Sequence, residues 1–124
     1  MRYDNFFLGV DDLDTAREFY EEKLGLKSKF GLSAKMPPGM LAYNVGNEEP
    51  AIFLKDQNIY PNLKPTIWFE VEDVNSEYTA LANNGVVFLS EPFEIRTGLA
   101  AEFEDPFGNR LGITDYSKIP DLAR

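Results

Sequence analysis

This chain lacks the two residue types that most often provide a general base, a metal ligand or a nucleophile. The sequence has no histidine and no cysteine, which removes the commonest general base, the commonest transition-metal ligands and any thiol nucleophile. The remaining candidates are Glu70, Glu102 and Glu104, which fall on expected strands. Glu70 and Glu102, if they face each other, would hold a cationic group or act as an acid/base pair, whereas solvated strand-edge charges are the simpler interpretation. Arg110 would pair with one of these carboxylates or with a ligand carboxylate.

Other short patterns predict structure and not catalysis. The acidic pairs at 11–12 and 72–73 each precede an expected helix and are typical of helix caps. Residues 105–109, Asp-Pro-Phe-Gly-Asn, are typical of a turn. No glycine-rich phosphate loop, nucleophile elbow or zinc-ligand spacing occurs. We therefore assign no catalytic residue from motifs alone.

Length and composition indicate one small domain. The chain has 124 residues, of which 44% are hydrophobic, enough for one core. No apolar stretch approaches the roughly 20 residues that span a bilayer, and the first residues do not begin a secretory signal, so a cytoplasmic protein is expected. The net charge of −9 argues against nucleic acid and anionic membranes as partners. Such acidity serves solubility or attracts a cationic ligand.

The elements that must position these side chains occur twice. A strand at 3–10 is followed by a helix from Asp12 to Gly25, and a strand at 66–71 by a helix over about 74–84 that Gly85 ends. The two halves align at an offset of 61 residues. Three strand candidates follow each helix, near 26–33, 40–46 and 51–56, and near 86–93, 98–104 and 110–115. The sequence therefore predicts a duplicated βαβββ unit.

Two stretches interrupt this periodicity. Residues 57–65 contain two prolines and make the natural joint between the halves. Residues 34–39, Ala-Lys-Met-Pro-Pro-Gly, separate two strands of the first half. They form either a plain loop or a lid over a ligand site.

Five short segments, in this order, resemble the vicinal oxygen chelate superfamily: residues 10–13, 19–20, 24–26, 71–74 and 103–109. That superfamily includes glyoxalases, extradiol dioxygenases and bleomycin-resistance proteins. The resemblance covers about residues 3–116 and implies an α+β fold. Two tandem βαβββ modules, at about 1–58 and 64–116, would form a cupped, eight-stranded mixed sheet in a single domain, followed by a tail at 117–124. It also implies a homodimer, either module-swapped or side by side.

In metal-dependent members of that superfamily, one ligand stands on the first and one on the last strand of each module. The matching positions here are Asn5, Phe53, Thr66 and Gly112. Phe53 has no donor atom and Gly112 has no side chain, so two weak neutral oxygens remain at best. We therefore expect neither a metal nor another cofactor, and no metal-dependent enolisation or oxygen activation.

Strand alternation divides the side chains between two faces. Apolar residues such as Leu8, Leu54, Phe69 and Ile113 fall on the side expected to face the helices. The opposite side would face the cup and bind the ligand, with an aromatic wall suited to a flat molecule. The predicted ligand-binding residues are Asn5, Phe7, Phe53, Thr66, Trp68, Glu70, Glu102, Arg110 and Gly112.

Three functions are compatible with these residues. The first is a metal-free module that binds or sequesters a cationic or aromatic small molecule. The resemblance to bleomycin-resistance proteins, which act in antibiotic resistance, suggests this function. The second is a glyoxalase- or dioxygenase-like enzyme with a non-standard site built from Glu70, Glu102 and Asn5. The third is a regulatory or partner-binding domain whose cup is unused.

Overall fold

The computed structural model describes residues 1–29 and 38–123. These residues divide into two compact units. The N-terminal unit comprises residues 5–65, and the C-terminal unit comprises residues 1–4 and 66–124. The division at 65/66 falls at the end of the proline-containing joint, and the first four residues of the chain belong with the second half.

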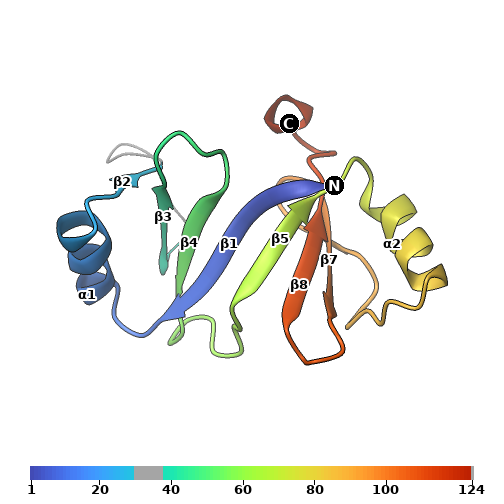
Figure 1. Cartoon of the computed structure of the whole chain (residues 1–124), viewed down its shortest axis with the longest axis horizontal. Coiled ribbons are helices and arrows are strands. Elements are labelled where there is room, and N and C mark those ends of the chain that lie inside the picture. Colours follow the sequence, from blue (N-terminus) through green and yellow to red (C-terminus); the bar gives the residue numbers. More distant parts are fainter. Residues whose placement is uncertain (30–37, 124) are drawn as a thin grey trace. The chain divides into compact units, whose positions relative to one another are not determined.

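The N-terminal unit follows the βαβββ order (Figure 1). Its strands are ordered β2-β3-β4-β1, with β1 parallel to β4 and the other neighbours antiparallel. The first helix is α-helical for five residues and then continues as a π-helix. The elements are β1 (Arg2–Val10), α1 (Leu13–Arg17), η1 (Glu18–Lys23), β2 (Lys27–Ser28), β3 (Met40–Asn44) and β4 (Ala51–Asp56).

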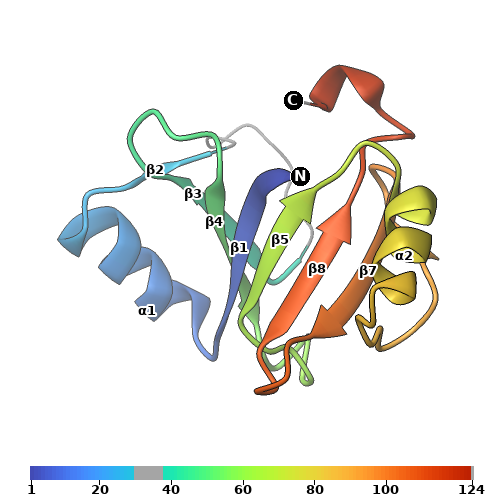
Figure 2. The same ribbon diagram turned by 45° about the vertical axis from the view of Figure 1, so that its right-hand side comes forward.

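The C-terminal unit repeats this order (Figure 2). Its strands are ordered β5-β8-β7-β6, with β5 parallel to β8. A short 3-10 helix, η2, follows the last strand. The elements are β5 (Thr66–Glu70), α2 (Val74–Asn83), β6 (Phe93–Glu94), β7 (Leu99–Glu104), β8 (Arg110–Thr114) and η2 (Pro120–Leu122).

Both helices begin and end at the expected residues. The Asp12 carboxylate accepts hydrogen bonds from the backbone N–H groups of Asp14 and Thr15, and Asp73 accepts one from Asn75. These bonds satisfy backbone donors that have no partner within the helix. Gly25 and Gly85 follow the helices at φ +72° and +94°, a conformation that favours glycine.

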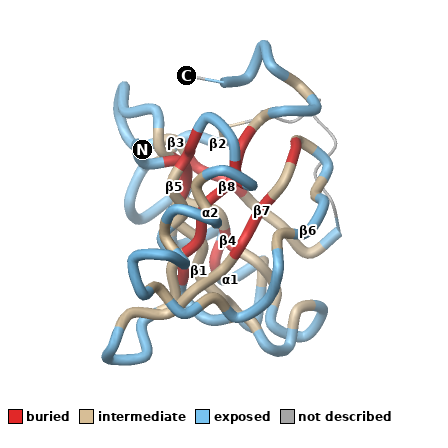
Figure 3. The backbone as a smooth tube through the Cα atoms, turned by 90° about the vertical axis from the view of Figure 1, so that its right-hand side faces the viewer, coloured by how far each residue is buried: buried red, intermediate tan, exposed pale blue. Residues whose placement is uncertain are grey.

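Each unit has its own core between one sheet face and its helix. In the N-terminal unit, Ala16 of α1 packs with Tyr43 and Leu54. In the C-terminal unit, Val74 of α2 packs with Ala101 and Ile113. Figure 3 shows that the buried backbone follows the strands, whereas the helices are largely exposed. The apolar faces predicted from alternation are therefore the faces that the helices cover.

The strand register repeats between the units. Asn5 pairs with Ala51 as Thr66 pairs with Arg110, and Phe7 pairs with Phe53 as Trp68 pairs with Gly112. Directly paired residues lie on the same face of a sheet. The predicted ligand-binding residues therefore occupy the face opposite the helix in each unit.

The expected fold class, α+β with two tandem βαβββ modules, is confirmed. The strand expected at 86–93 is wrong in extent. In its place the structure has one bridge, between Phe88 and Phe103, and the two-residue strand β6. Pro92 interrupts the segment, since proline has no N–H to donate to a neighbouring strand.

Two further expected segments lie partly outside the residues that the structure describes. The strand expected near 26–33 is observed as Lys27–Ser28, and residues 30–33 lie outside the described part of the chain. Of the loop or lid at 34–39, residues 34–37 also lie outside it. Among the residues that the structure describes, no helix is long and apolar enough to cross a membrane.

Candidate functional site

Phe7 and Phe53 form a stacked pair on the helix-free face of the N-terminal unit. The two ring centroids are 5.0 Å apart and the ring planes differ by 15°. Both side chains are half-buried. The Lys55 Nζ lies 4.9 Å from the Phe7 centroid, and the Lys29 Nζ lies 5.5 Å from the Phe53 centroid. An ammonium group therefore lies against each ring of the pair, at cation–π distance.

Asn5 lies on the same face, two residues before Phe7 on β1, and its partner Ala51 lies two residues before Phe53 on β4. Its side-chain Oδ1 accepts a hydrogen bond of 3.0 Å from the backbone N–H of Ala51, and the residue is buried. This bond links the start of β4 to β1. The Asn5 amide therefore has a structural role that the sequence does not reveal.

Trp68 and Gly112 are neighbours on the helix-free face of the C-terminal unit. They are paired in the register of β5 and β8. A Cβ atom at position 112 would lie 2.5 Å from Trp68 Cε3. The indole therefore occupies the space that a side chain on β8 would need, so glycine at 112 is required for packing.

Arg110, Glu102 and Glu104 form an ion-pair cluster on this face. The Arg110 Nη1 donates to Glu102 Oε2 at 3.0 Å, and its Nη2 lies 3.6 Å from Glu104 Oε1. The Arg110 Nε is buried and has no hydrogen-bond partner among the described residues. The predicted pairing of Arg110 with a neighbouring carboxylate is therefore present, and the cluster carries two negative charges against one positive charge.

Glu70 lies one row away from Glu102 in the sheet. Glu70 pairs with Thr114, whereas Glu102 pairs with Gly112. The register thus does not place the two carboxylates opposite each other within the C-terminal unit. Thr66, at the other end of β5, is buried and pairs with Arg110.

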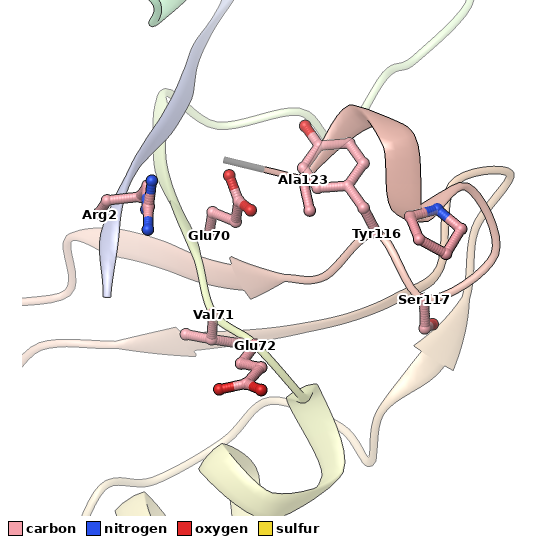
Figure 4. Close-up of a pocket in the computed structure, with 8 residues that line it drawn as sticks. Arg2, Glu70, Val71, Glu72, Tyr116, Ser117 and Ala123 are labelled. Carbon is pink, nitrogen blue, oxygen red and sulfur yellow. The ribbon is translucent and has the colours of Figure 1, made fainter.

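Glu70 instead lines a pocket of about 320 Å³ at the end of β5. Figure 4 shows its carboxylate among side chains from the first strand, the β5–α2 connection and the C-terminal segment. Glu70 is only 5% exposed. The other lining residues are Arg2, Val71, Glu72, Tyr116, Ser117, Pro120 and Ala123.

Tyr116 fixes one wall of this pocket. Its hydroxyl donates a hydrogen bond to the buried carboxylate of Asp4, which joins the segment after β8 to the start of β1. The pocket volume is at the lower end of the range for small-molecule sites, and the pocket combines acidic, basic and hydroxyl groups. Apart from Glu70, its residues were not predicted, because most lie in segments without a periodic pattern.

Asp115 is a second polar residue that sequence reasoning missed. It is 1% exposed and accepts hydrogen bonds from the backbone N–H groups of Val74, Leu99 and Ser117, as well as from the Ser117 hydroxyl. Burial raises the pKa of Asp115, but these hydrogen bonds together outweigh it, so the pKa lies below the usual value. The role of Asp115 is to join segments, and its position directly after a buried strand was the only signal in the sequence.

The residues at the four superfamily ligand positions do not fit a divalent metal. The Asn5 oxygen already accepts a backbone hydrogen bond, Phe53 has no donor atom, and the indole of Trp68 lies over Gly112. Among residues 1–29 and 38–123, no group of three or more histidine, cysteine or acidic side chains is arranged to hold a metal ion. A metal would need carboxylate, imidazole or thiolate ligands.

Three comparisons place the chain among known proteins. A sequence model of the Glyoxalase/Bleomycin resistance protein/Dioxygenase superfamily matches residues 2–113. The uncharacterized protein YurT of Bacillus subtilis is 33% identical over 115 residues, which cover 84% of this chain and 91% of YurT.

Two solved structures share the fold. The hypothetical protein BH1468 from Bacillus halodurans superimposes with a TM-score of 0.71 at 19% identity, covering 92% of this chain and 93% of that one. Methylmalonyl-CoA epimerase from Mycobacterium tuberculosis gives a TM-score of 0.69 at 18% identity, covering 92% of this chain and 87% of the epimerase. At these identities the likeness extends to the fold and not to the activity.

Proposed function

Because the chain belongs to the Glyoxalase/Bleomycin resistance protein/Dioxygenase superfamily, we propose that it binds or sequesters a small molecule with a flat or aromatic group, without using a metal. One observation carries the proposal. Aromatic rings, Phe7 with Phe53 and Trp68 over Gly112, occupy the central register positions of the helix-free face in both units. Half-buried rings offer a flat ligand apolar contact and stacking.

The pocket at Glu70 supports binding of a cationic group there. Glu70 is 5% exposed and lines a pocket. Its carboxylate attracts an ammonium or guanidinium group more strongly than an exposed carboxylate does, because the local dielectric constant is lower. Arg2 and Glu72 also line this pocket, so a ligand with both donors and acceptors fits it best. The cationic preference expected from the net charge is thus proposed for this pocket only.

The enzyme hypothesis has less support. Of its three proposed residues, Asn5 already accepts a backbone hydrogen bond and Glu102 is paired with Arg110. An acid/base pair that includes Glu70 also needs a second group within reach of the same substrate atom. Metal analysis of protein purified without chelator separates the two hypotheses, since stoichiometric zinc, nickel, iron or manganese would favour the enzyme.

The fluorescence of Trp68, the sole tryptophan, tests the binding proposal. Titration with a panel of small aromatic compounds of either charge should quench or shift its emission. The variant Trp68→Ala, followed by calorimetry, should weaken binding of an active compound by about ten- to a hundredfold, equivalent to about 1–3 kcal/mol. Gly112→Ala should have a related effect, because the added methyl group displaces the indole.

Phe107→Ala provides the matched control. Phe107 is an aromatic residue of the same unit, but it is 88% exposed in the turn after β7, and its loss should leave affinity unchanged. A panel that neither perturbs Trp68 emission nor produces heat would count against a binding function. It would favour the third hypothesis, a regulatory or partner-binding domain.

A further inference from the structure

Asn84 lies at the end of α2 and precedes Gly85 in the only Asn-Gly sequence of the chain. In water, the backbone nitrogen of the residue after an asparagine is able to attack the side-chain carbonyl and displace ammonia. Glycine favours this reaction, because it has no Cβ atom to hinder the approach and leaves the backbone free to rotate. The type and order of these two residues therefore indicate a site of spontaneous chemical modification.

The surroundings of Asn84 leave its side chain accessible. Asn84 and Gly85 are both exposed. Within residues 1–29 and 38–123, the Asn84 side-chain amide makes no hydrogen bond. No atom of these residues lies within 4 Å of the place that a Cβ atom on Gly85 would occupy. Water therefore reaches both residues, and no hydrogen bond restrains the amide that would react.

The folded backbone holds the attacking nitrogen away from the side chain. Asn84 has φ −88° and ψ 6°. At this ψ the Gly85 nitrogen is eclipsed with the backbone nitrogen of Asn84 and not with its Cβ atom, as closure of a five-membered ring requires. The Gly85 N–H also donates to the carbonyl of Ala82 at 3.1 Å. The backbone must therefore rotate, and this bond must break, before the ring closes.

The last turn of α2 is weakly held and so permits this rotation. Leu81 packs against the core of the unit, but Ala82, Asn83 and Asn84 after it are exposed. Asparagine ranks low in helix propensity, and helix ends open more readily than helix interiors. Opening of this turn would release the Gly85 N–H without disturbing the core.

From these observations we infer that Asn84 is a deamidation site and that opening of the last turn of α2 controls its rate. The Gly85 nitrogen loses its proton and bonds to Asn84 Cγ, the Cγ–Nδ2 bond breaks, and Nδ2 leaves with that proton as ammonia. Water then opens the succinimide ring. Its addition at Cγ gives aspartate, and its addition at the main-chain carbonyl carbon gives isoaspartate. The inference does not depend on the proposed binding function.

The products would weaken the end of the helix. Both carry a new carboxylate at the C-terminal end of α2, where the helix dipole disfavours negative charge. The last turn of α2 has no basic residue to offset this charge. Isoaspartate also lengthens the main chain directly before Gly85, whose φ of +94° belongs to the present helix end. Modified protein should therefore be less stable than unmodified protein.

Peptide mapping by mass spectrometry tests the inference on the full chain after prolonged incubation. Asn84 should deamidate several times faster than Asn75, an exposed asparagine of the same helix that precedes a serine. The rate should be higher at mildly alkaline than at neutral pH, because the attacking nitrogen must lose its proton. Treatment with an isoaspartate-specific methyltransferase should label the modified protein. Deamidation at Asn84 no faster than at Asn75 would show that the inference is wrong.

A helix variant tests whether opening of the last turn controls the rate. Ala82→Gly should accelerate deamidation of Asn84 by up to about fivefold, because glycine favours the open turn relative to alanine. Ala123→Gly, which makes the same change at an exposed residue outside α2, is the control and should leave the rate unchanged. Equal rates in Ala82→Gly and the unaltered protein would contradict this control by the helix.

A comparison without any variant gives a second measure. The unaltered chain unfolded in guanidinium chloride should deamidate at Asn84 several times faster than the folded chain at the same pH, because the bond from Gly85 to Ala82 is then absent. Equal rates in the folded and unfolded chain would mean that the helix end offers no protection, and the inferred control would be wrong.

Discussion

Asp115 joins three segments of the C-terminal unit through a single carboxylate. It binds the first N–H group of α2, the N–H group of Leu99 at the start of β7, and the backbone and hydroxyl of Ser117. Gly98 has no side chain where Asp115 approaches it, and a Cβ atom there would collide with the Asp115 carboxylate. The residue thus fixes the edge of the unit that borders the pocket at Glu70.

Asp115→Ala should destabilise the protein by about 3 kcal/mol at neutral pH, because it leaves several buried N–H donors without an acceptor. Chemical denaturation at a series of pH values measures the effect. The pKa of Asp115 is lowered in the folded protein. Its contribution is therefore fully present above the unfolded pKa of about 3.9 and is lost as the pH falls through the folded pKa.

The exposed Asp121→Asn variant is the control and should change stability by less than about 0.5 kcal/mol. An Asp115→Ala variant as stable as this control would show that water replaces the lost acceptor. A stability difference that grows as the pH falls below 4 would contradict the assigned direction of the pKa shift.

For single residues, the sequence shows which side chains have no metal-binding atom, but it does not show which other side chains they contact. That Phe53 and Gly112 provide no metal ligand follows from residue type alone. The hydrogen bond from Ala51 to Asn5, the contact of Trp68 with Gly112 and the lysines beside the aromatic pair depend on which residues meet across strands. Strand register and side-chain rotamers determine these contacts, and the alternation of apolar and polar residues alone does not specify them.

At the scale of elements, α2 depends on two carboxylates at its N-terminus. Asp73 Oδ1 accepts from the Asn75 N–H at 3.2 Å and its Oδ2 from the Ser76 hydroxyl at 2.7 Å. Asp115 accepts from the Val74 N–H. The cap by Asp73 was predicted, because this residue directly precedes the helix. The interaction with Asp115 was not, because Asp115 lies 41 residues from Val74 in the sequence.

Asp73→Ala should destabilise the protein by about 1 kcal/mol, the usual cost of losing an N-cap. Thermal or chemical denaturation measures the loss. Asp73→Ser should restore most of it, because the serine hydroxyl also accepts from the first helical turn. Glu72→Ala removes a neighbouring negative charge but no cap hydrogen bond, and a loss as large as that of Asp73→Ala would mean that charge and not capping stabilises α2.

Long periodic elements were predicted more accurately than short ones. Strands β1, β4, β5, β7 and β8 and both helices lie where alternation and caps place them. The π-helical continuation of α1 and the two-residue strands β2 and β6 were not predicted in this form. Such short elements contain too few residues to show a period, and tertiary pairing determines them.

For the whole molecule, the net charge is a sum that does not show how the helix-free faces of the two units differ in charge. The value of −9 led to the expectation of a cationic ligand. The strand register, however, places lysines on the helix-free face of one unit, and three glutamates with one arginine on that of the other. Local charge at a binding surface governs recognition more than the total does.

The last prediction concerns assembly. The chain is expected to form a symmetric homodimer, and part of the C-terminal unit presents apolar residues for such an interface. Val87, Leu89 and Phe93, in the segment between α2 and β7, are 75%, 47% and 38% exposed. Apolar side chains gathered on one segment are typical of protein–protein contacts, and an isologous dimer would bury each set once.

Light scattering at micromolar concentration should therefore give twice the chain mass of 14.1 kDa. The double variant Val87→Glu, Leu89→Glu should shift the protein toward the single-chain mass, because two carboxylates would have to be buried in each half of the interface. Phe107→Glu, which alters an exposed residue in a separate turn, is the control and should leave the mass unchanged. A single-chain mass for the unaltered protein would rule out the dimer. A double variant that retains the dimer mass would place the interface on another surface, since a segment carrying two buried glutamates per chain could not remain at its centre.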